Sequence, residues 1–110
     1  HVPLTRETKH LVNQEYFHHF RKPIFLLNTS RGEVLDTLAL VQALKDGKVL
    51  GAGLDVLEIE KFPALGNQAW YPDLLTQSNV LLSPHVAGWT QESYRKIAEV
   101  LAQKLKNLQI

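Results

Sequence analysis

The hydrophobic positions of this 110-residue chain form several short continuous runs that polar segments separate. A strand buried on both faces of a parallel sheet has no polar side to alternate with, so such runs predict strands. We predict three of them, over residues 24–27, 49–56 and 80–82. Residues 1–4 fit the end of a fourth strand, which Pro3 would stop.

Three other segments have the features of helices, over residues 14–20, 37–46 and 91 to about 108. Each follows a residue whose side chain commonly caps a helix N-terminus: Asn13, Asp36 and Thr90. Apolar positions spaced three and four residues apart mark one face of the longest helix: Ile97, Val100, Leu101, Leu105 and Leu108. Residues 58–78 contain two prolines and predict a long, partly ordered loop.

Strands and helices therefore alternate, which is typical of an α/β fold with a parallel sheet and right-handed connections. Gly47 suits the left-handed position after the second helix. Gly51 and Gly53, in the second strand, are expected to let a helix pack closely. Periodicity alone names no function.

The composition narrows the class of protein. The net charge is +1 and the Lys and Arg residues are scattered, which argues against a nucleic-acid partner. No apolar stretch approaches the ~20 residues that span a bilayer, so we expect no membrane partner. The absence of cysteine excludes disulfides and fits a cytoplasmic location. The chain contains no Met, and we expect it to be a fragment of a longer protein.

Polar side chains follow each predicted strand at its carboxyl end. They are an arginine, three carboxylates and a histidine: Arg31, Asp55, Glu58, Glu60 and His85. Ligands of open parallel sheets bind beyond this end of the strands, so the five residues are expected at one edge. A cation for an anionic substrate, an acid–base histidine and a carboxylate beside it make a candidate active site.

Each of these residues also has a purely structural interpretation. Arg31 could pair with Glu33 on the surface, where isolated ion pairs are common and weak. Asp55 could cap the end of its strand, and a single Glu in a loop is usually solvated. His85 follows a proline and could be a hydrogen-bonded turn residue.

Four segments carry a resemblance to a known enzyme family. They are residues 1–8, which include His-Val-Pro-Leu-Thr; 28–36, Asn-Thr-Ser-Arg-Gly-Glu-Val-Leu-Asp; 51–56, Gly-Ala-Gly-Leu-Asp-Val; and 83–90, Ser-Pro-His-Val-Ala-Gly-Trp-Thr. In this order they resemble the D-isomer-specific 2-hydroxyacid dehydrogenases, which include phosphoglycerate, glycerate, lactate and formate dehydrogenases. The resemblance runs from residue 1 to about residue 101.

The resemblance implies roles for three candidate residues. Arg31 would bind the substrate carboxylate and polarise the substrate carbonyl, with a planar fork of donors that suits a carboxylate. His85 would move a proton on or off the substrate oxygen. Glu60, at the family's spacing from Asp55, would hydrogen-bond the imidazole and fix its tautomer. Glu58 stays an alternative for this acid, because the residue after Glu60 is not the family's usual proline.

The resemblance also implies NAD as cofactor, with hydride transfer between C4 of nicotinamide and C2 of a 2-hydroxy or 2-oxo acid. Asp55 matches the residue that contacts the nicotinamide end. No metal site is predicted. The residues implied to touch the dinucleotide are Val2, Pro3, Thr29, Ser30, Arg31, Asp55, His85 and Gly88.

The implied architecture is half of a Rossmann-type parallel sheet with flanking helices and a long C-terminal helix. Residues 1–89 would be the C-terminal half of a dinucleotide-binding domain, and 90–110 a helix that crosses toward a substrate domain. The Gly-x-Gly-x-x-Gly fingerprint for the pyrophosphate is absent from the sequence, so we expect the isolated chain to be inactive. The family usually dimerises through this domain and free sheet edges recruit partners, so a homodimer is expected.

Two other functions remain open at this point. Transcriptional corepressors that resemble the family keep the same Arg, Glu and His, so the chain could be a non-catalytic, NAD-sensing interaction module. It could also be a structural α/β domain in which the three residues are incidental. The oxidoreductase fragment is the leading interpretation.

Overall fold

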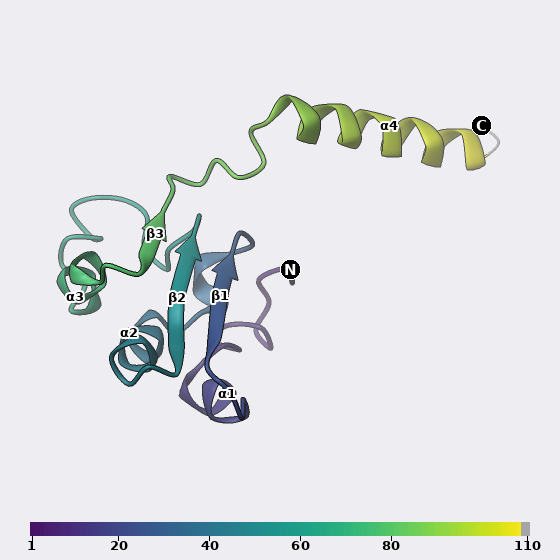
Figure 1. Cartoon of the computed structure of the whole chain (residues 1–110). Coiled ribbons are helices and arrows are strands. Elements are labelled where there is room, and N and C mark those ends of the chain that lie inside the picture. Colours follow the sequence, from purple (N-terminus) through teal and green to yellow (C-terminus); the bar gives the residue numbers. More distant parts are fainter. Residues whose placement is uncertain (109–110) are drawn as a thin grey trace.

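The computed structural model describes residues 1–108 as a three-stranded sheet with helices behind it and a long helix that extends away (Figure 1). The elements in chain order are α1 (Gln14–His18), β1 (Ile24–Asn28), a single 3-10 turn η1 (Gly32–Val34), α2 (Thr37–Lys45), β2 (Val49–Leu54), α3 (Trp70–Thr76), β3 (Val80–Leu82) and α4 (Gln91–Asn107).

The sheet confirms the predicted α/β class. Its order is β1–β2–β3 and both pairs are parallel, with Leu26 opposite Ala52 and Ala52 opposite Val80. α2 connects β1 to β2, and α3 connects β2 to β3. All three strands therefore end at the same edge of the sheet, where the segments that follow them meet.

The helix ends follow the predicted capping chemistry. The side-chain oxygens of Asn13, Asp36 and Thr90 accept hydrogen bonds from amides of the first turns of α1, α2 and α4, each at 3.0 Å. These bonds satisfy donors that have no partner within the helix. Gly47 follows α2 with a φ of +71°, the left-handed conformation expected of it. The predicted helix starts are thus confirmed, while α1 ends earlier than expected, at His18.

The hydrophobic core lies between the sheet and the helices behind it. The predicted inner face of α2, formed by Leu40, Val41 and Leu44, is buried there. Leu54 of β2 and Leu74 of α3 pack into the same cluster. This one-sided core fixes the strands against α2 and α3 and so fixes the edge where the polar residues meet.

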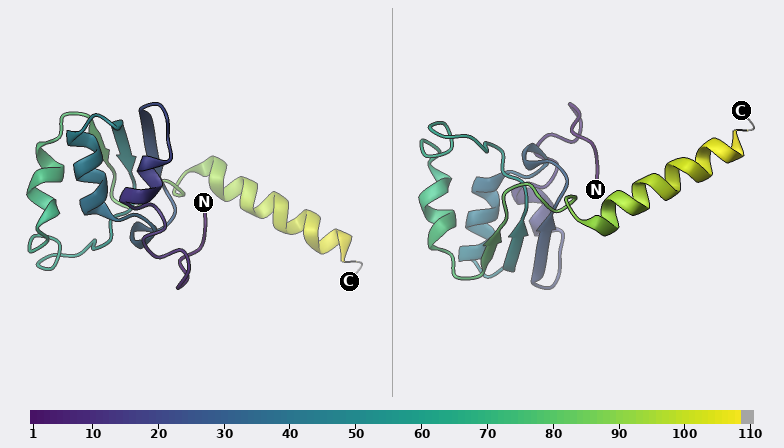
Figure 2. Two further views of the ribbon diagram at one scale, coloured as in Figure 1. Left: turned by 90° about the horizontal axis from the view of Figure 1, so that it is seen from below. Right: turned by 90° about the horizontal axis from the view of Figure 1, so that it is seen from above.

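The opposite face of the sheet is open, which corrects the prediction for residues 24–27. Phe25 is 74% exposed, Leu27 79% and Leu81 78%, because all three short helices lie on the other face (Figure 2). Gly51 and Gly53 lie next to these side chains rather than against a helix. A Cβ at Gly53 would come 2.8 Å from a Leu27 methyl group.

Two further predictions are wrong in detail. Residues 1–4 form no strand, and the carbonyl of Pro3 instead accepts a hydrogen bond from the Thr8 hydroxyl at 2.7 Å. The predicted loop over 58–78 contains α3. Pro72 is the third residue of that helix, where proline is tolerated because first-turn amides lack helical partners anyway.

α4 projects from the α/β body (Figures 1 and 2). The helix predicted from its amphipathic pattern is confirmed, but it has no packing partner among residues 1–108. Its apolar stripe is exposed: Ile97, Val100, Leu101, Leu105 and Leu108. Residues 109 and 110, the end of the predicted 90–110 helix segment, lie outside the described residues. Within the described part of the chain, no helix is long and apolar enough to cross a membrane.

Candidate active site

The turn after β1 is built around a buried asparagine. The Asn28 carboxamide oxygen accepts hydrogen bonds from the amide and the hydroxyl of Ser30, at 3.1 and 2.9 Å. Its nitrogen donates to the carbonyl of Arg31 at 3.1 Å. The asparagine thereby fixes the backbone on both sides of the turn and leaves the Arg31 side chain exposed at the sheet edge.

Asp55, directly after β2, organises the turn that follows β3. Its carboxylate is buried and accepts hydrogen bonds from the Ser83 hydroxyl at 2.7 Å and from the amides of Val86 and Ala87 at 2.9 and 3.0 Å. Burial alone would raise the pKa of Asp55, but the hydrogen bonds from this turn outweigh burial and hold its pKa below the ordinary value. Asp55 is therefore ionised, and its hydrogen bonds hold the segment that carries His85. We refer to these bonds as the Asp55 clamp.

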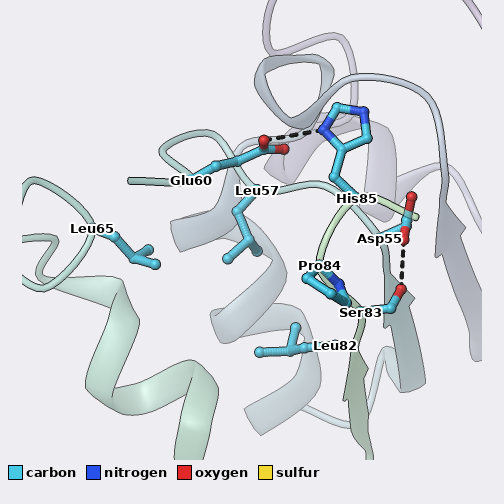
Figure 3. Close-up of a pocket in the computed structure, with 8 residues that line it drawn as sticks. All are labelled: Asp55, Leu57, Glu60, Leu65, Leu82, Ser83, Pro84 and His85. Carbon is cyan, nitrogen blue, oxygen red and sulfur yellow. Dashed lines mark hydrogen bonds and ion pairs between the residues drawn. The ribbon is translucent and has the colours of Figure 1, made fainter. Parts of the chain in front are cut away.

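His85 lies within that clamped turn, in a left-handed backbone conformation with a φ of +59°. Its amide donates to the carbonyl of Asp55 at 2.9 Å. Its Nδ1 lies 3.0 Å from a carboxylate oxygen of Glu60, as Figure 3 shows, and both side chains are about half exposed. With Nδ1 occupied by Glu60, Nε2 is the nitrogen available to a ligand.

Arg31, Glu60 and His85 line one pocket of about 420 Å³. The Arg31 guanidinium donates to the carbonyl of Ser30 at 2.7 Å, and among residues 1–108 it makes no ion pair. The surface pair with Glu33 considered from the sequence does not form, because Glu33 instead pairs with Lys9 at 3.3 Å.

A second pocket, of about 360 Å³, adjoins the first and shares Leu57, Glu60 and His85 with it. Leu65, Leu82 and Pro84 give it an apolar wall (Figure 3). The volume is in the range of small-molecule sites. The edge of the sheet thus combines a free cation and a histidine–carboxylate pair with apolar surface.

Glu58, the alternative acid, lines the pocket of Arg31, Glu60 and His85, but its carboxylate has other partners than His85. One of its carboxylate oxygens lies 2.8 Å from Nε2 of His10, and the other accepts a hydrogen bond from the amide of Thr37 at 2.6 Å. The geometry therefore pairs His85 with Glu60 and gives Glu58 separate partners.

The residues implied to touch a dinucleotide fall into two groups on the same edge. Beside β1, Val2 and Ser30 line one pocket. Thr29 hydrogen-bonds the His1 ring at 3.0 Å, and Pro3 follows His1 and Val2 on the N-terminal segment. The second group lies beside β2 and β3 and consists of Asp55, His85 and Gly88.

These residues suit one end of a dinucleotide. The exposed Thr29 hydroxyl, the apolar Val2 and Gly88, with no atom within 4 Å of its would-be Cβ, can border a ribose and a flat heterocycle. Within residues 1–108, no glycine-rich turn lies at a helix N-terminus to receive a pyrophosphate. The described residues thus fit one end of a dinucleotide and not its pyrophosphate.

Sequence reasoning missed three residues that shape the site. Ser83 holds the Asp55 carboxylate, and His10 holds Glu58. At Gly32 a Cβ would lie 1.9 Å from the carbonyl oxygen of Leu57, so two loops meet backbone to backbone. Of these three residues only Gly32 could have been recognised in the sequence, because glycine lets two backbones approach closely.

Comparison with known proteins places this geometry in a family. The sequence model described as "D-isomer specific 2-hydroxyacid dehydrogenase, NAD binding domain" matches residues 1–87. A glyoxylate reductase of Thermofilum pendens is 47% identical over 105 residues, which are 96% of this chain and 29% of that protein. A glyoxylate reductase of Korarchaeum cryptofilum is 44% identical over 107 residues, 96% of this chain and 30% of that protein.

Solved structures agree. The D-lactate dehydrogenase of Aquifex aeolicus, complexed with NAD and lactic acid, superposes with a TM-score of 0.74 at 35% identity, over 98% of this chain and 35% of that one. The NAD-complexed D-isomer specific 2-hydroxyacid dehydrogenase of Lactobacillus delbrueckii gives 0.72 at 33% identity, over 99% and 35%. The chain thus spans about a third of the length of these relatives.

Proposed function

Because this chain belongs to the D-isomer specific 2-hydroxyacid dehydrogenase family, we propose that it supplies the carboxylate-binding and acid–base residues of an NAD-dependent oxidoreductase. The reaction would interconvert a 2-oxo acid and a D-2-hydroxy acid. The observation that supports this most is the convergence of Arg31, Glu60 and His85 on one pocket.

The substrate carboxylate would bind the Arg31 guanidinium, whose parallel N–H groups match two carboxylate oxygens. In reduction, His85 donates its Nε2 proton to the oxygen on C2 as the carbonyl becomes a hydroxyl. Glu60 accepts the Nδ1 proton in a hydrogen bond, which orients the ring and stabilises its charged form. Bound NADH supplies the hydride.

We also propose that the neighbouring apolar wall limits water around the reacting carbon. Leu65 and Leu82 border the Glu60–His85 pair in the pocket that Arg31 does not line, and Leu57 lines both pockets. An apolar border limits water around the reacting carbon and strengthens the attraction between Arg31 and the substrate carboxylate. Val2, Pro3, Thr29, Ser30, Asp55 and Gly88 would border the cofactor.

The test is an assay of the full-length protein that carries this sequence. Purified protein with NADH and either glyoxylate or pyruvate should oxidise the cofactor, and Arg31→Ala and His85→Ala should each lower kcat/KM by about 100-fold or more. Binding of NADH without turnover of any 2-oxo acid would instead favour the NAD-sensing interaction module.

Three further assignments are proposals for the whole protein. Residues 1–89 would form the C-terminal half of the cofactor domain, with α4 leading toward a substrate domain. The whole protein would be a homodimer, and it would be cytoplasmic. Sedimentation of the full-length protein tests the second assignment, with a monomer at assay concentrations as the contrary result.

A further inference from the structure

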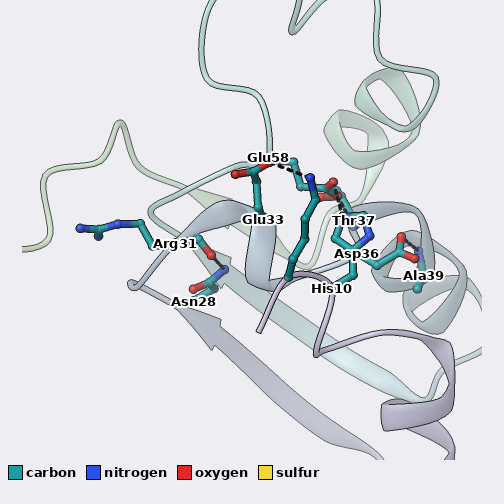
Figure 4. Close-up of polar contacts among 9 residues, drawn as sticks. His10, Asn28, Arg31, Glu33, Asp36, Thr37, Ala39 and Glu58 are labelled. Carbon is teal, nitrogen blue, oxygen red and sulfur yellow. Dashed lines mark hydrogen bonds and ion pairs between the residues drawn. The ribbon is translucent and has the colours of Figure 1, made fainter. Parts of the chain in front are cut away.

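Glu58 is a largely buried carboxylate that the proposed chemistry does not use. Its side chain is 17% exposed, against 41% for Glu60 two residues later. Both of its oxygens are engaged, one by the Thr37 amide at 2.6 Å and the other by Nε2 of His10 at 2.8 Å (Figure 4). Such short contacts to an ionised carboxylate are stronger than neutral hydrogen bonds.

The partners of Glu58 belong to two other segments. Thr37 is the first residue of α2, so its amide has no acceptor within the helix. A carboxylate at this position also faces the positive end of the helix dipole. His10 ends the turn over residues 6–10 and is itself held by a hydrogen bond from its amide to the carbonyl of Glu33 at 2.8 Å. Glu58 therefore fastens the segment after β2 to two fixed points.

That segment also touches the turn that carries the arginine. The Cα of Gly32 lies so close to the Leu57 carbonyl that no Cβ fits between them. Arg31 directly precedes Gly32, and Glu58 directly follows Leu57. The Leu57 carbonyl is thus held against the Arg31 turn, and Glu58 anchors the next residue on the way to Glu60.

Glu60 depends on this arrangement because little else holds it. Within the described residues, the contact with His85 is the one hydrogen bond of its side chain. His85, in contrast, is held by the Asp55 clamp. The position of Glu60 relative to His85 is therefore set mainly by the backbone of residues 56–59.

We propose that Glu58 is a positioning residue for the acid–base pair: by anchoring its segment to α2 and His10, it keeps Glu60 within hydrogen-bonding distance of His85. This inference rests on the proposed function for Glu60 and His85. Glu58 lines the same pocket, but Thr37 and His10 occupy both of its carboxylate oxygens, so it acts through Glu60.

Asp36 provides a matched control. It is the other carboxylate at the N-terminus of α2, where it accepts from the Ala39 amide at 3.0 Å. Its removal weakens the same helix end but leaves the segment over 56–60 in place. A role of Glu58 in stability alone predicts that both substitutions behave alike.

The experiment measures kcat and KM in the full-length protein with NADH and its best 2-oxo acid. Glu58→Ala should lower kcat by about 10-fold to 100-fold, as for catalytic groups displaced by about 1 Å, with KM within about threefold. Asp36→Ala should keep kcat within about twofold. Glu58→Gln should restore most of the loss, because its amide can accept from Thr37 and donate to His10.

A double-mutant cycle identifies the route. In a Glu60→Gln background, Glu58→Ala should cost less than about threefold, because the group that it positions is already changed. Equal losses in both backgrounds, or losses that Asp36→Ala reproduces, would overturn the proposal.

A structural measurement separates this inference from the proposed function. Nitrogen-15 NMR of the imidazoles in the same protein should show loss of the His85 Nδ1 hydrogen bond in Glu58→Ala and not in Asp36→Ala. If wild-type protein turns over no 2-oxo acid, the proposed function fails, and this spectrum still decides the positioning role. An unchanged His85 signal in Glu58→Ala refutes it.

Discussion

The amide of His85 donates to the carbonyl of Asp55 at 2.9 Å, while the carboxylate of Asp55 accepts from the two amides that follow His85. One residue thus holds the candidate acid–base histidine from both sides. The left-handed φ of His85 is a conformation that few non-glycine residues adopt, and this clamp offsets its cost.

Replacement of Asp55 by Asn should therefore destabilise the fold. The new amide would turn one donor toward the amides of Val86 or Ala87, and a buried unsatisfied donor costs about 1–3 kcal/mol. We expect a loss of about 2–3 kcal/mol in the free energy of unfolding by urea. Asp73→Asn, which breaks an exposed pair with Lys45, should cost less than about 1 kcal/mol. Equal effects of the two changes would contradict the clamp.

The same carboxylate should make stability depend on acid. The pKa of Asp55 is lower in the folded chain than its ordinary value of 3.8, so the stabilisation is fully present above that value. It is lost as the pH falls through the lower folded pKa. The stability difference between wild type and Asp55→Asn should be constant near neutral pH and shrink below about pH 4. A difference that does not vary with pH between 2 and 6 would refute this.

Gly32→Ala should be among the most damaging small substitutions. The added Cβ would lie 1.9 Å from the Leu57 carbonyl oxygen, a backbone atom that cannot rotate away. Overpacking of this kind costs about 3 kcal/mol or more, which a melting curve detects. Gly88→Ala is the matched control, since nothing lies within 4 Å of its Cβ position. Similar melting temperatures for the two variants would argue against the close contact.

Arg31→Lys should lower activity without affecting stability. A lysine offers a point charge in place of the two parallel donors, and one charged hydrogen bond is worth about 1.5–3 kcal/mol, or roughly 10-fold to 100-fold in kcat/KM. The melting temperature should hold, because the side chain is exposed and its hydrogen bond is to a local carbonyl. Arg95→Lys, in α4, is the control, and full activity of Arg31→Lys would remove Arg31 from carboxylate binding.

α4 should exchange its amide hydrogens much faster than the sheet in the 110-residue chain. It has no packing partner among the described residues, and a helix of this length is marginal in water on its own. Hydrogen exchange followed by mass spectrometry should therefore find β2 protected and residues 91–107 open. Strong protection of α4 would mean that its apolar stripe is covered in solution, and dilution would then show whether a second copy covers it.

The sequence predicts the local structure well where the chemistry is local. Asn13, Asp36 and Thr90 cap helices because a short polar side chain reaches its own first turn, whatever the rest of the fold does. The inner face of α2 follows from periodicity. The prediction that residues 24–27 are buried on both faces was wrong, because an apolar run shows only that both faces of a strand can be covered. Nothing within residues 1–108 covers the second face.

The site was less accessible to such reasoning. The edge of a parallel sheet indicates that Arg31, Glu60 and His85 gather, but it does not distinguish Glu60 from Glu58. That distinction depends on the path of the chain after Leu54. His10 and the start of α2, which are far from Glu58 in the sequence, determine this path through their contacts with Glu58. Contacts between segments that are far apart in sequence leave no periodic pattern to read.

Residues 61–79, which follow Glu60 and lead to β3, have a further consequence. Lys61, Ala64 and Leu65 border the two pockets, yet Arg31 and His85, on separate turns, do not depend on them. This stretch carries α3 and packs into the core through Leu65, Trp70 and Leu74. In the proposed enzyme, exchange of residues 61–79 would therefore reshape the pocket walls at Lys61, Ala64 and Leu65, while Arg31, Glu60 and His85 keep their positions.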